Sequence, residues 1–183
     1  MVTIMILKGE KVILRPIKMS DAPRFVKWFN DPEVNKFMFI RKLTLPEERK
    51  YISRRIKDRM KNTITLAIET EQGVHIGSVG IDDINKSNRH AGFGIIIGEK
   101  DYWSRGYGTE AGRLIINYAF KKLKLHRLDL DVYDYNPRAQ RLYKKLGFKK
   151  EGIKREHNLY KGKFRKVIYM GLLDKEWKKK IKK

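Results

Sequence analysis

The stretch from Gly92 to Phe120 constrains the fold of this chain more than any other. It contains an apolar run typical of a strand, a short aromatic connection, a glycine-containing turn and an amphipathic helical pattern. A turn at a helix N-terminus leaves backbone N–H groups unpaired, and the helix dipole favours an anion there. Gly106 and Gly108 flank Tyr107, so the main chain can approach a ligand and adopt positive φ. The stretch predicts either a phosphate-binding turn or a tight structural corner.

Neither of the common nucleotide-binding motifs is present in this stretch. The chain has no G-x-x-x-x-G-K-[ST] segment, which excludes a P-loop. The dinucleotide fingerprint G-x-G-x-x-G is also absent, because the spacing between Gly108 and Gly112 is one residue too long. The remainder of the chain therefore has to identify the ligand.

Length and composition indicate one globular domain. The chain has 183 residues, of which 41% are hydrophobic, so we expect a single domain over residues 1–183 that ends in a basic tail at 175–183. The absence of cysteine excludes disulfides, thiolate zinc sites and cysteine nucleophiles. No segment has membrane-spanning length and the N-terminus lacks a signal-peptide pattern, so we expect a cytoplasmic protein without a membrane partner.

The net charge is unusually high. Lys and Arg number 43 against 21 Asp and Glu, a formal net charge of +22. Such a field could attract nucleic acid, steer an anionic cofactor, or reflect the proteome of a thermophile. The lack of cysteine and the low glutamine content are typical of thermophilic proteins. The charge alone does not choose among the three.

Hydrophobic periodicity predicts a mixed sheet flanked by helices. Leu128, Leu130 and Val132 alternate with polar residues, as expected for a strand with one buried face. Asn136-Pro137 then predicts a helix start, with asparagine as N-cap and proline in the first turn. Taken in order, the predicted strands are 12–17, 63–70, 75–84, 89–98, 125–135, 148–153 and 164–172, with helices at 20–29, 44–60, after the glycine turn, and at 137–146. The first two helices are expected to cover one side of the sheet.

Two segments carry a family resemblance. Asn136-Pro-Arg-Ala-Gln-Arg-Leu-Tyr-Lys-Lys-Leu-Gly-Phe148 resembles, as N-x-x-A-x-x-x-Y-x-x-x-G-F, a motif of the GNAT superfamily of acetyl-CoA-dependent N-acetyltransferases. Tyr102 to Ala111 is similar to that family's pyrophosphate-binding loop. The similarity runs from Leu14 to Leu172 and is nearest to ribosomal-protein and spermidine N-acetyltransferases. It implies the acyl-CoA N-acyltransferase fold, an α/β fold whose mixed, mostly antiparallel sheet is flanked by helices.

The resemblance implies acetyl-CoA as cosubstrate and assigns its binding residues. The pyrophosphate would bind the backbone amides of the glycine turn, and the pantetheine arm would follow the strand before it. Asn136 would contact the cofactor, although a plain N-cap explains it equally well. The residues implied for cofactor binding are Ile96, Ile97, Arg105, Gly106, Tyr107, Gly108, Thr109, Glu110, Asn136 and Tyr143.

The resemblance also implies the proton-transfer residues. Tyr143 would protonate the departing thiolate, whereas the alternative is a core aromatic, since it lies on the apolar face of its helix. The base is less well defined, because a primary amine must lose a proton before it attacks. Asp131 and Glu156 are the main candidates, Asp82 and Asp83 are further ones, and a solvated carboxylate is the alternative for each.

Departures from the family pattern bear on the acceptor. Trp103 replaces the usual Arg or Gln of the loop, Gly92 stands where relatives have Glu, and Lys166 stands where they have Asp. Losing two acidic groups disfavours a polycation such as spermidine. We therefore expect an N-acetyltransferase that acts on a protein N-terminus, of the ribosomal-protein type, with RNA nearby.

Other readings of the acceptor and of the assembly remain open. A polyamine or aminoglycoside acetyltransferase, or a non-catalytic CoA- or RNA-binding module, is the alternative. No metal site is expected, because His75, His90, His126 and His157 lack ligand spacing. The sequence leaves the oligomeric state open, with a homodimer among the expectations.

Overall fold

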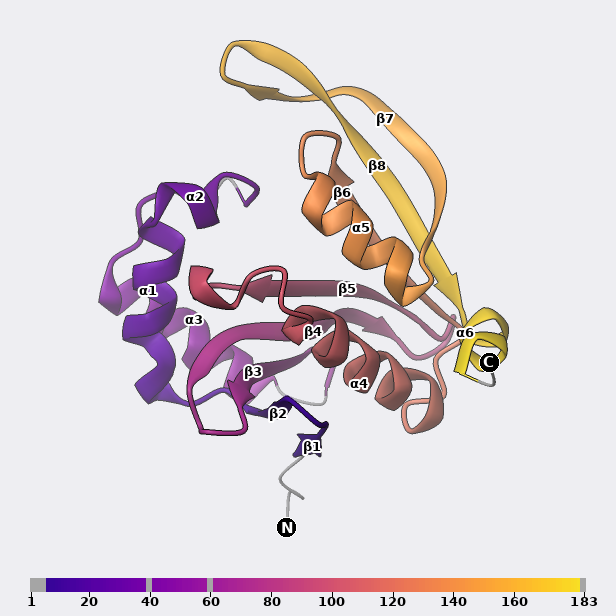
Figure 1. Ribbon diagram of the computed structural model, residues 1–183, viewed down its shortest axis with the longest axis horizontal. Coiled ribbons are helices and arrows are strands. Elements are labelled where there is room, and N and C mark those ends of the chain that lie inside the picture. The colour runs from indigo at the N-terminus through magenta and orange to yellow at the C-terminus, as the bar shows by residue number, and fades with distance from the viewer. Residues whose placement is uncertain (1–5, 39–40, 59–60, 182–183) are drawn as a thin grey trace.

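The computed structural model describes residues 6–38, 41–58 and 61–181, which form one mixed sheet with helices on both faces (Figure 1). The sheet has eight strands in the order β1-β2-β3-β4-β5-β6-β8-β7 within these residues. The strands are β1 (Leu7–Lys8), β2 (Val12–Pro16), β3 (Ile64–Thr70), β4 (His75–Asn85), β5 (His90–Ile97), β6 (Arg127–Tyr133), β7 (Lys149–Tyr160) and β8 (Lys163–Leu173). The helices are α1 (Ala22–Asn30), α2 (Pro32–Asn35), α3 (Leu45–Lys57), α4 (Tyr107–Lys121), α5 (Pro137–Leu146) and α6 (Asp174–Ile181), with 3₁₀ turns at Met19–Asp21 and Lys100–Tyr102.

Alternation along the central strands places a hydrophobic core on each face of the sheet. In β3, Leu66 and Ile68 belong to the larger core, which α4 and α5 cover, whereas Ala67 between them belongs to a smaller core under α1 and α3. The larger core is tight at the helix contact, because a Cβ on Gly112 of α4 would lie 2.6 Å from the Leu146 side chain of α5. The predicted mixed sheet and its helical cover are therefore confirmed.

The sheet opens between β5 and β6. These strands pair in parallel only from His90↔Arg127 to Gly92↔Asp129. Beyond that point β5 stays paired with β4 as far as Ile97, and β6 stays paired with β8 as far as Tyr133. Each strand thus keeps hydrogen bonds on its outer edge while the inner edges diverge, and Figure 1 shows β6, β7 and β8 turning away from the other strands.

The C-terminal region differs most from the sequence prediction. A strand was expected at 148–153, but β7 continues to Tyr160 and forms with β8 a long hairpin that projects from the sheet (Figure 1). A register shift between Lys154 and Asn158, with Glu156 at a φ of 50°, interrupts the side-chain alternation that would have revealed the strand. The predicted basic tail begins inside α6, and Trp177 of that helix is buried.

A smaller difference lies at the end of the first predicted helix. The helix predicted at 20–29 ends at Asn30, and the chain restarts at once as α2. The Asp31 side chain caps this short helix by accepting a hydrogen bond of 2.8 Å from the Glu33 amide. The cap sets the path of the residues that follow, which reach the opening between β5 and β6.

Candidate active site

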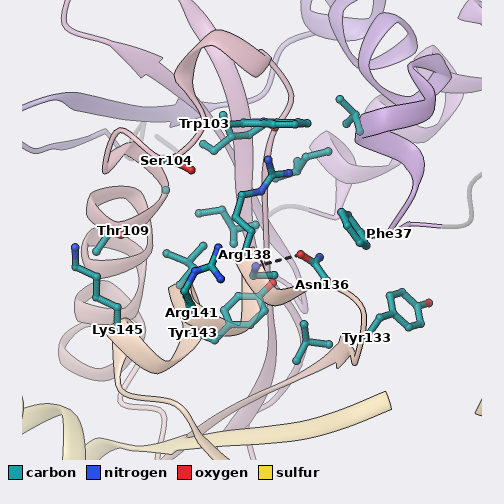
Figure 2. Close-up of a pocket in the computed structure, with 18 of the residues that line it drawn as sticks. Phe37, Trp103, Ser104, Thr109, Tyr133, Asn136, Arg138, Arg141, Tyr143 and Lys145 are labelled. Atoms are coloured by element: carbon teal, nitrogen blue, oxygen red, sulfur yellow. Dashed lines mark hydrogen bonds between the residues drawn. The ribbon is translucent and has the colours of Figure 1, made fainter. Parts of the chain in front are cut away.

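A cavity of about 440 Å³ occupies the opening between β5 and β6 (Figure 2). Its walls come from α2 and the residues after it, β5, the loop before α4, β6 and α5. The lining residues are Val34, Phe37, Met38, Ile95, Ile96, Ile97, Tyr102, Trp103, Ser104, Gly106, Gly108, Thr109, Asp131, Val132, Tyr133, Asn136, Arg138, Ala139, Arg141, Leu142, Tyr143 and Lys145. A mostly apolar cavity of this size suits an organic ligand.

The loop before α4 offers free backbone amides to this cavity. Gly106 is the N-cap of α4 with φ 92° and ψ −15°, a left-handed conformation that favours glycine. The amides of Thr109 and Glu110 donate to the Gly106 carbonyl at 2.9 and 3.1 Å. Within the described residues no acceptor is found for the amides of Gly106, Tyr107 or Gly108. This arrangement fits an anion at a helix N-terminus, as the glycine turn predicted.

The predicted cofactor residues divide into those that line the cavity and those that do not. Ile96, Ile97, Gly106, Gly108, Thr109, Asn136 and Tyr143 line it. The Glu110 carboxylate instead accepts a hydrogen bond of 2.9 Å from the Lys11 amide, and the Tyr107 ring packs edge-on against Tyr102. Arg105 is exposed. The side chains of Tyr107 and Glu110 are thus engaged elsewhere, which leaves their backbone as the part available for ligand binding.

The end of β5 and the start of α5 are joined by side chains. The Trp103 indole donates a hydrogen bond of 2.7 Å to the Ile97 carbonyl, which holds the ring at the end of the strand. The Arg138 guanidinium stacks on that ring with 3.5 Å from its central carbon to the ring centroid. Trp103, which departs from the family pattern, therefore positions a cation in the cavity.

The start of α5 is held by two side chains. Asn136 accepts a hydrogen bond of 3.1 Å from the Ala139 amide, so it is the N-cap that the sequence predicted. The Gln140 amide donates to the carbonyls of Tyr133 and Asp134, both at 3.0 Å. These contacts fix the connection from β6 and thereby the direction of the side chains on α5.

Tyr143 lies on α5 with its ring packed edge-on against Phe93 and Phe148. Figure 2 shows the side chain pointing into the cavity near Asn136. Its hydroxyl has no hydrogen-bond partner within the described part of the chain. Burial raises the pKa of Tyr143 to about 12, so the hydroxyl is protonated at neutral pH. The residue is both a core aromatic and an available proton donor.

The candidate bases lie in different environments. Asp131 lines the cavity, and its carboxylate accepts a hydrogen bond of 2.5 Å from the Lys154 ammonium. Glu156 is exposed in the irregular part of β7 and lines neither this cavity nor the one beside it. Asp82 is bound by Arg55 and Thr63 of another part of the molecule, and Asp83 is exposed. Among these four carboxylates, only Asp131 is in the cavity wall.

A second cavity of about 320 Å³ continues from the first toward the β7–β8 hairpin. It shares Phe37, Met38, Asp131 and Tyr133 with the first cavity, and His157 and Val167 complete its lining. Following the reaction that the family resemblance implies, we call it the acceptor pocket and call the cavity beside the glycine turn the donor cavity. Sequence reasoning missed Phe37 and His157, for which no motif or periodic pattern gave a signal.

Sequence reasoning also missed three cations of α5. Arg138, Arg141 and Lys145 all line the donor cavity. Their signal was available, since spacings of three and four residues place them on one face of the helix, away from its apolar face. Arg141 and Lys145, the two further along the helix, suit a ligand that carries phosphate groups.

The described residues contain neither a cluster of metal ligands nor a membrane-spanning helix. In the described ranges, no group of three or more His, Asp or Glu side chains is placed to hold a metal ion. None of the helices in the part of the chain that the structure describes is long and apolar enough to cross a membrane.

Comparison with known proteins agrees with this geometry. Residues 11–149 match the family model described as the acetyltransferase (GNAT) domain. An uncharacterized N-acetyltransferase, p20 of Bacillus licheniformis, is 29% identical over 93% of this chain and 97% of its own. Spermidine N(1)-acetyltransferase of Escherichia coli K12 is 28% identical over 92% of this chain and 89% of its own. The solved spermidine N-acetyltransferase of Vibrio cholerae, in complex with CoA and spermine, superposes with a TM-score of 0.84 at 25% identity and covers 92% of this chain and 99% of that one.

Proposed function

The chain belongs to the GNAT family of acetyltransferases and is an acetyl-CoA-dependent N-acetyltransferase, and we propose that its acceptor is the primary amine of a peptide or protein N-terminus. We propose residues 1–183 as a single N-acetyltransferase domain. The observation that carries the acceptor proposal is the composition of the acceptor pocket. Its described lining holds one carboxylate, Asp131, and that carboxylate is already bonded to Lys154.

The donor cavity suits coenzyme A in shape and charge. We assign the pyrophosphate to the free amides of Gly106, Tyr107 and Gly108, with Arg141 and Lys145 as charge partners. The pantetheine arm would follow the edge of β5 at Ile96 and Ile97, opposite Asn136. This placement would bring the thioester toward Tyr143, which lines the donor cavity.

The reaction is a direct transfer. The unprotonated amine attacks the thioester carbonyl, a C–N bond forms, and negative charge develops on the carbonyl oxygen. Collapse of this tetrahedral intermediate breaks the C–S bond, and the sulfur takes up one proton while the nitrogen loses one. We assign the donated proton to the Tyr143 hydroxyl, which regains a proton from the nitrogen.

The weak base in the site favours an acceptor of low pKa. An α-amino group has a pKa of about 7.7–8.0, whereas an alkylamine such as lysine has about 10.4. Deprotonation of the α-amine is therefore easier by about 3 kcal/mol at a given pH. Asp131, already engaged by Lys154, is the base that we propose, acting directly or through water. We therefore propose that Asp131 can remove the proton of a peptide N-terminus more readily than that of an alkylamine.

Spermidine is the second candidate acceptor, because named relatives from Escherichia coli and Vibrio cholerae are spermidine N-acetyltransferases. A polycation needs several carboxylate partners, and the described lining of both cavities supplies only Asp131. An aminoglycoside makes the same demand. The net charge of +22 is compatible with a target near RNA, such as a ribosomal protein, which is the finer form of our proposal.

Release of CoA with a panel of acceptors tests the proposal. The purified enzyme would be supplied with acetyl-CoA and, separately, with short peptides that have free N-termini, the same peptides with blocked N-termini, spermidine and an aminoglycoside. We expect turnover with free peptides and none with blocked ones. Faster turnover with spermidine than with every peptide would replace the peptide acceptor by a polyamine. No turnover with any amine would contradict both.

A further inference from the structure

The charged side chains around the reaction site are strongly unbalanced. In the described lining of the two cavities Asp131 is the only carboxylate, whereas Arg138, Arg141, Lys145 and His157 are basic. The Asp131 carboxylate is 2.5 Å from the Lys154 ammonium, and each side chain is 44% exposed. An acceptor that brings more positive charge therefore meets no free carboxylate there.

Arg138 forms no ion pair within the described residues. Its side chain is half-buried and stacks on Trp103 at 3.5 Å. Its guanidinium donates no hydrogen bond to any residue that the structure describes. The nearby Glu33 carboxylate is bound by Lys100 at 2.6 Å instead. A guanidinium carries five N–H donors, and leaving them unpaired in a half-buried position is costly unless a ligand accepts them.

Arg138 is separate from the cations that we assign to coenzyme A. Figure 2 shows Lys145 beside Thr109 at the start of α4, whereas Arg138 extends to Trp103. Glu33 of α2 acts electrostatically on the Arg138 guanidinium, so the two side chains lie near each other. The Arg138 guanidinium therefore lies on the side of the cavity that α2 covers, and Phe37, which lines both cavities, follows that helix in the chain.

The position of Arg138 along α5 sets a distance from the reacting amine. Arg138 precedes Tyr143 by five residues, which is about 7.5 Å along a helix axis. An extended peptide covers about 7 Å in two residues. A carboxylate near the N-terminus of a peptide can thus reach Arg138 while the amine lies at the thioester.

We propose that the enzyme selects peptide N-termini with an Asp or Glu at the first or second position, and that Arg138, stacked on Trp103, binds that carboxylate. The inference rests on the proposed peptide acceptor. A guanidinium can bind a carboxylate through two parallel hydrogen bonds, and its stacked orientation reduces the rotamer freedom lost on binding. Lys154 acts in the same direction, because it occupies the carboxylate that an additional cation would need.

Paired peptides test this selectivity in the full-length enzyme. One peptide carries Glu at position two, and its partners carry Gln or Lys there with the rest unchanged. CoA release under saturating acetyl-CoA gives kcat/KM for each. We expect the Glu peptide to exceed the Gln peptide by about ten- to a hundredfold, and the Lys peptide to be the poorest. Arg138→Gln is expected to bring the Glu peptide to the level of the Gln peptide.

Three comparisons keep the outcome unambiguous. Arg113→Gln removes the same charge from the exposed face of α4, outside both cavities, and should retain the preference. Arg138→Glu should reverse it in favour of the Lys peptide. Turnover of the Gln peptide and the KM for acetyl-CoA, measured for every variant, report whether that variant is folded.

Three results would contradict the proposed role of Arg138 or the proposed function. Equal rates for the three peptides would overturn the selectivity while leaving a peptide acetyltransferase. A higher KM for acetyl-CoA in Arg138→Gln, with peptide preference unchanged, would assign Arg138 to the cofactor phosphates. Absence of turnover with all peptides would remove the proposed function itself.

Discussion

The two sides of the reaction site are built in opposite ways. The donor side comes mainly from two stretches, residues 95–109 and residues 131–145, and offers main-chain amides around Gly106. The acceptor side is assembled from separate segments and presents side chains to the ligand. These side chains include Phe37, Asp131, His157 and Val167. A site made of backbone tolerates side-chain replacement, whereas a site made of side chains changes with each one. The comparison teaches why the donor can be common to a family while acceptors differ.

The largest effect is expected on the donor side, at Tyr143, which lines the donor cavity. Tyr143→Phe removes the hydroxyl but keeps the ring that packs on Phe93 and Phe148. Loss of a positioned acid should lower kcat by about 10²- to 10⁴-fold while acetyl-CoA binding is unchanged. Steady-state kinetics with calorimetric titration of acetyl-CoA measure both quantities. Tyr118→Phe, a partly buried tyrosine of α4 outside both cavities, is the matched control.

The next effect concerns the helical layer that supports the acceptor side. Glu48 of α3 is buried, its Oε1 atom lacks a partner in the described structure, and burial raises its pKa to about 7 from 4.5. The folded state therefore holds the proton more tightly, so stability is fully present below about pH 4.5 and falls as the pH rises toward 7. The difference corresponds to about 3 kcal/mol.

Glu48→Gln removes this titration. We expect the variant to match the parent in free energy of unfolding near pH 4.5 and to exceed it by up to about 3 kcal/mol above pH 7. Urea unfolding of both proteins from pH 4.5 to 8 gives the difference, with Glu71→Gln in an exposed turn as control. A difference that does not vary with pH would show that Glu48 does not titrate in this range.

The third prediction tests the acceptor side directly. Asp131→Asn removes the proposed base and should lower kcat/KM for a peptide by about ten- to a hundredfold at pH 7. The deficit should shrink above the α-amine pKa of about 8, because the amine is then already neutral. Asp129→Asn, on the same face of β6 and paired with Arg127, is the control. A deficit that persists undiminished at pH 9 would assign Asp131 to binding instead of proton removal.

The smallest effect is expected at the backbone of the donor side. Gly106→Ala places a side chain at φ 92°, which costs about 1–2 kcal/mol, although the added Cβ would meet no atom within 4 Å. The free loop should relax out of this conformation, so the KM for acetyl-CoA rises about five- to thirtyfold. Gly152→Ala, where φ is not positive and space is also free, should change nothing. An unchanged KM in Gly106→Ala would argue against an anion bound at these amides.

Most of the donor side could be predicted because its determinants are local. The turn around Gly106, the N-cap Asn136 and the apolar face that carries Tyr143 each depend on residues a few positions apart. The strand alternation that placed Asp131 opposite Leu130 and Val132 was equally local. Such patterns follow from helix and strand periodicity, which can be recognised from the spacing of apolar residues in the sequence.

The acceptor side was harder to predict, and the base illustrates why. Asp131 and Glu156 were comparable in the sequence, since both follow the glycine turn and both sit near strands. The register shift in β7 turns that strand so that His157, and not Glu156, reaches the pocket. The position of a bulge depends on contacts across the hairpin, so a local sequence pattern does not predict it.

By itself, the sequence determined the family and the fold and predicted where the acetyl donor binds, because each follows from motifs and periodicities within short segments. The tertiary structure decided what surrounds the acceptor amine. In the folded chain Phe37 and His157 line the same pocket, Lys154 donates a hydrogen bond to Asp131, and Arg138 stacks on Trp103. Phe37 and His157 are far apart in the chain, and only the divergence of β5 from β6 brings them together at one pocket.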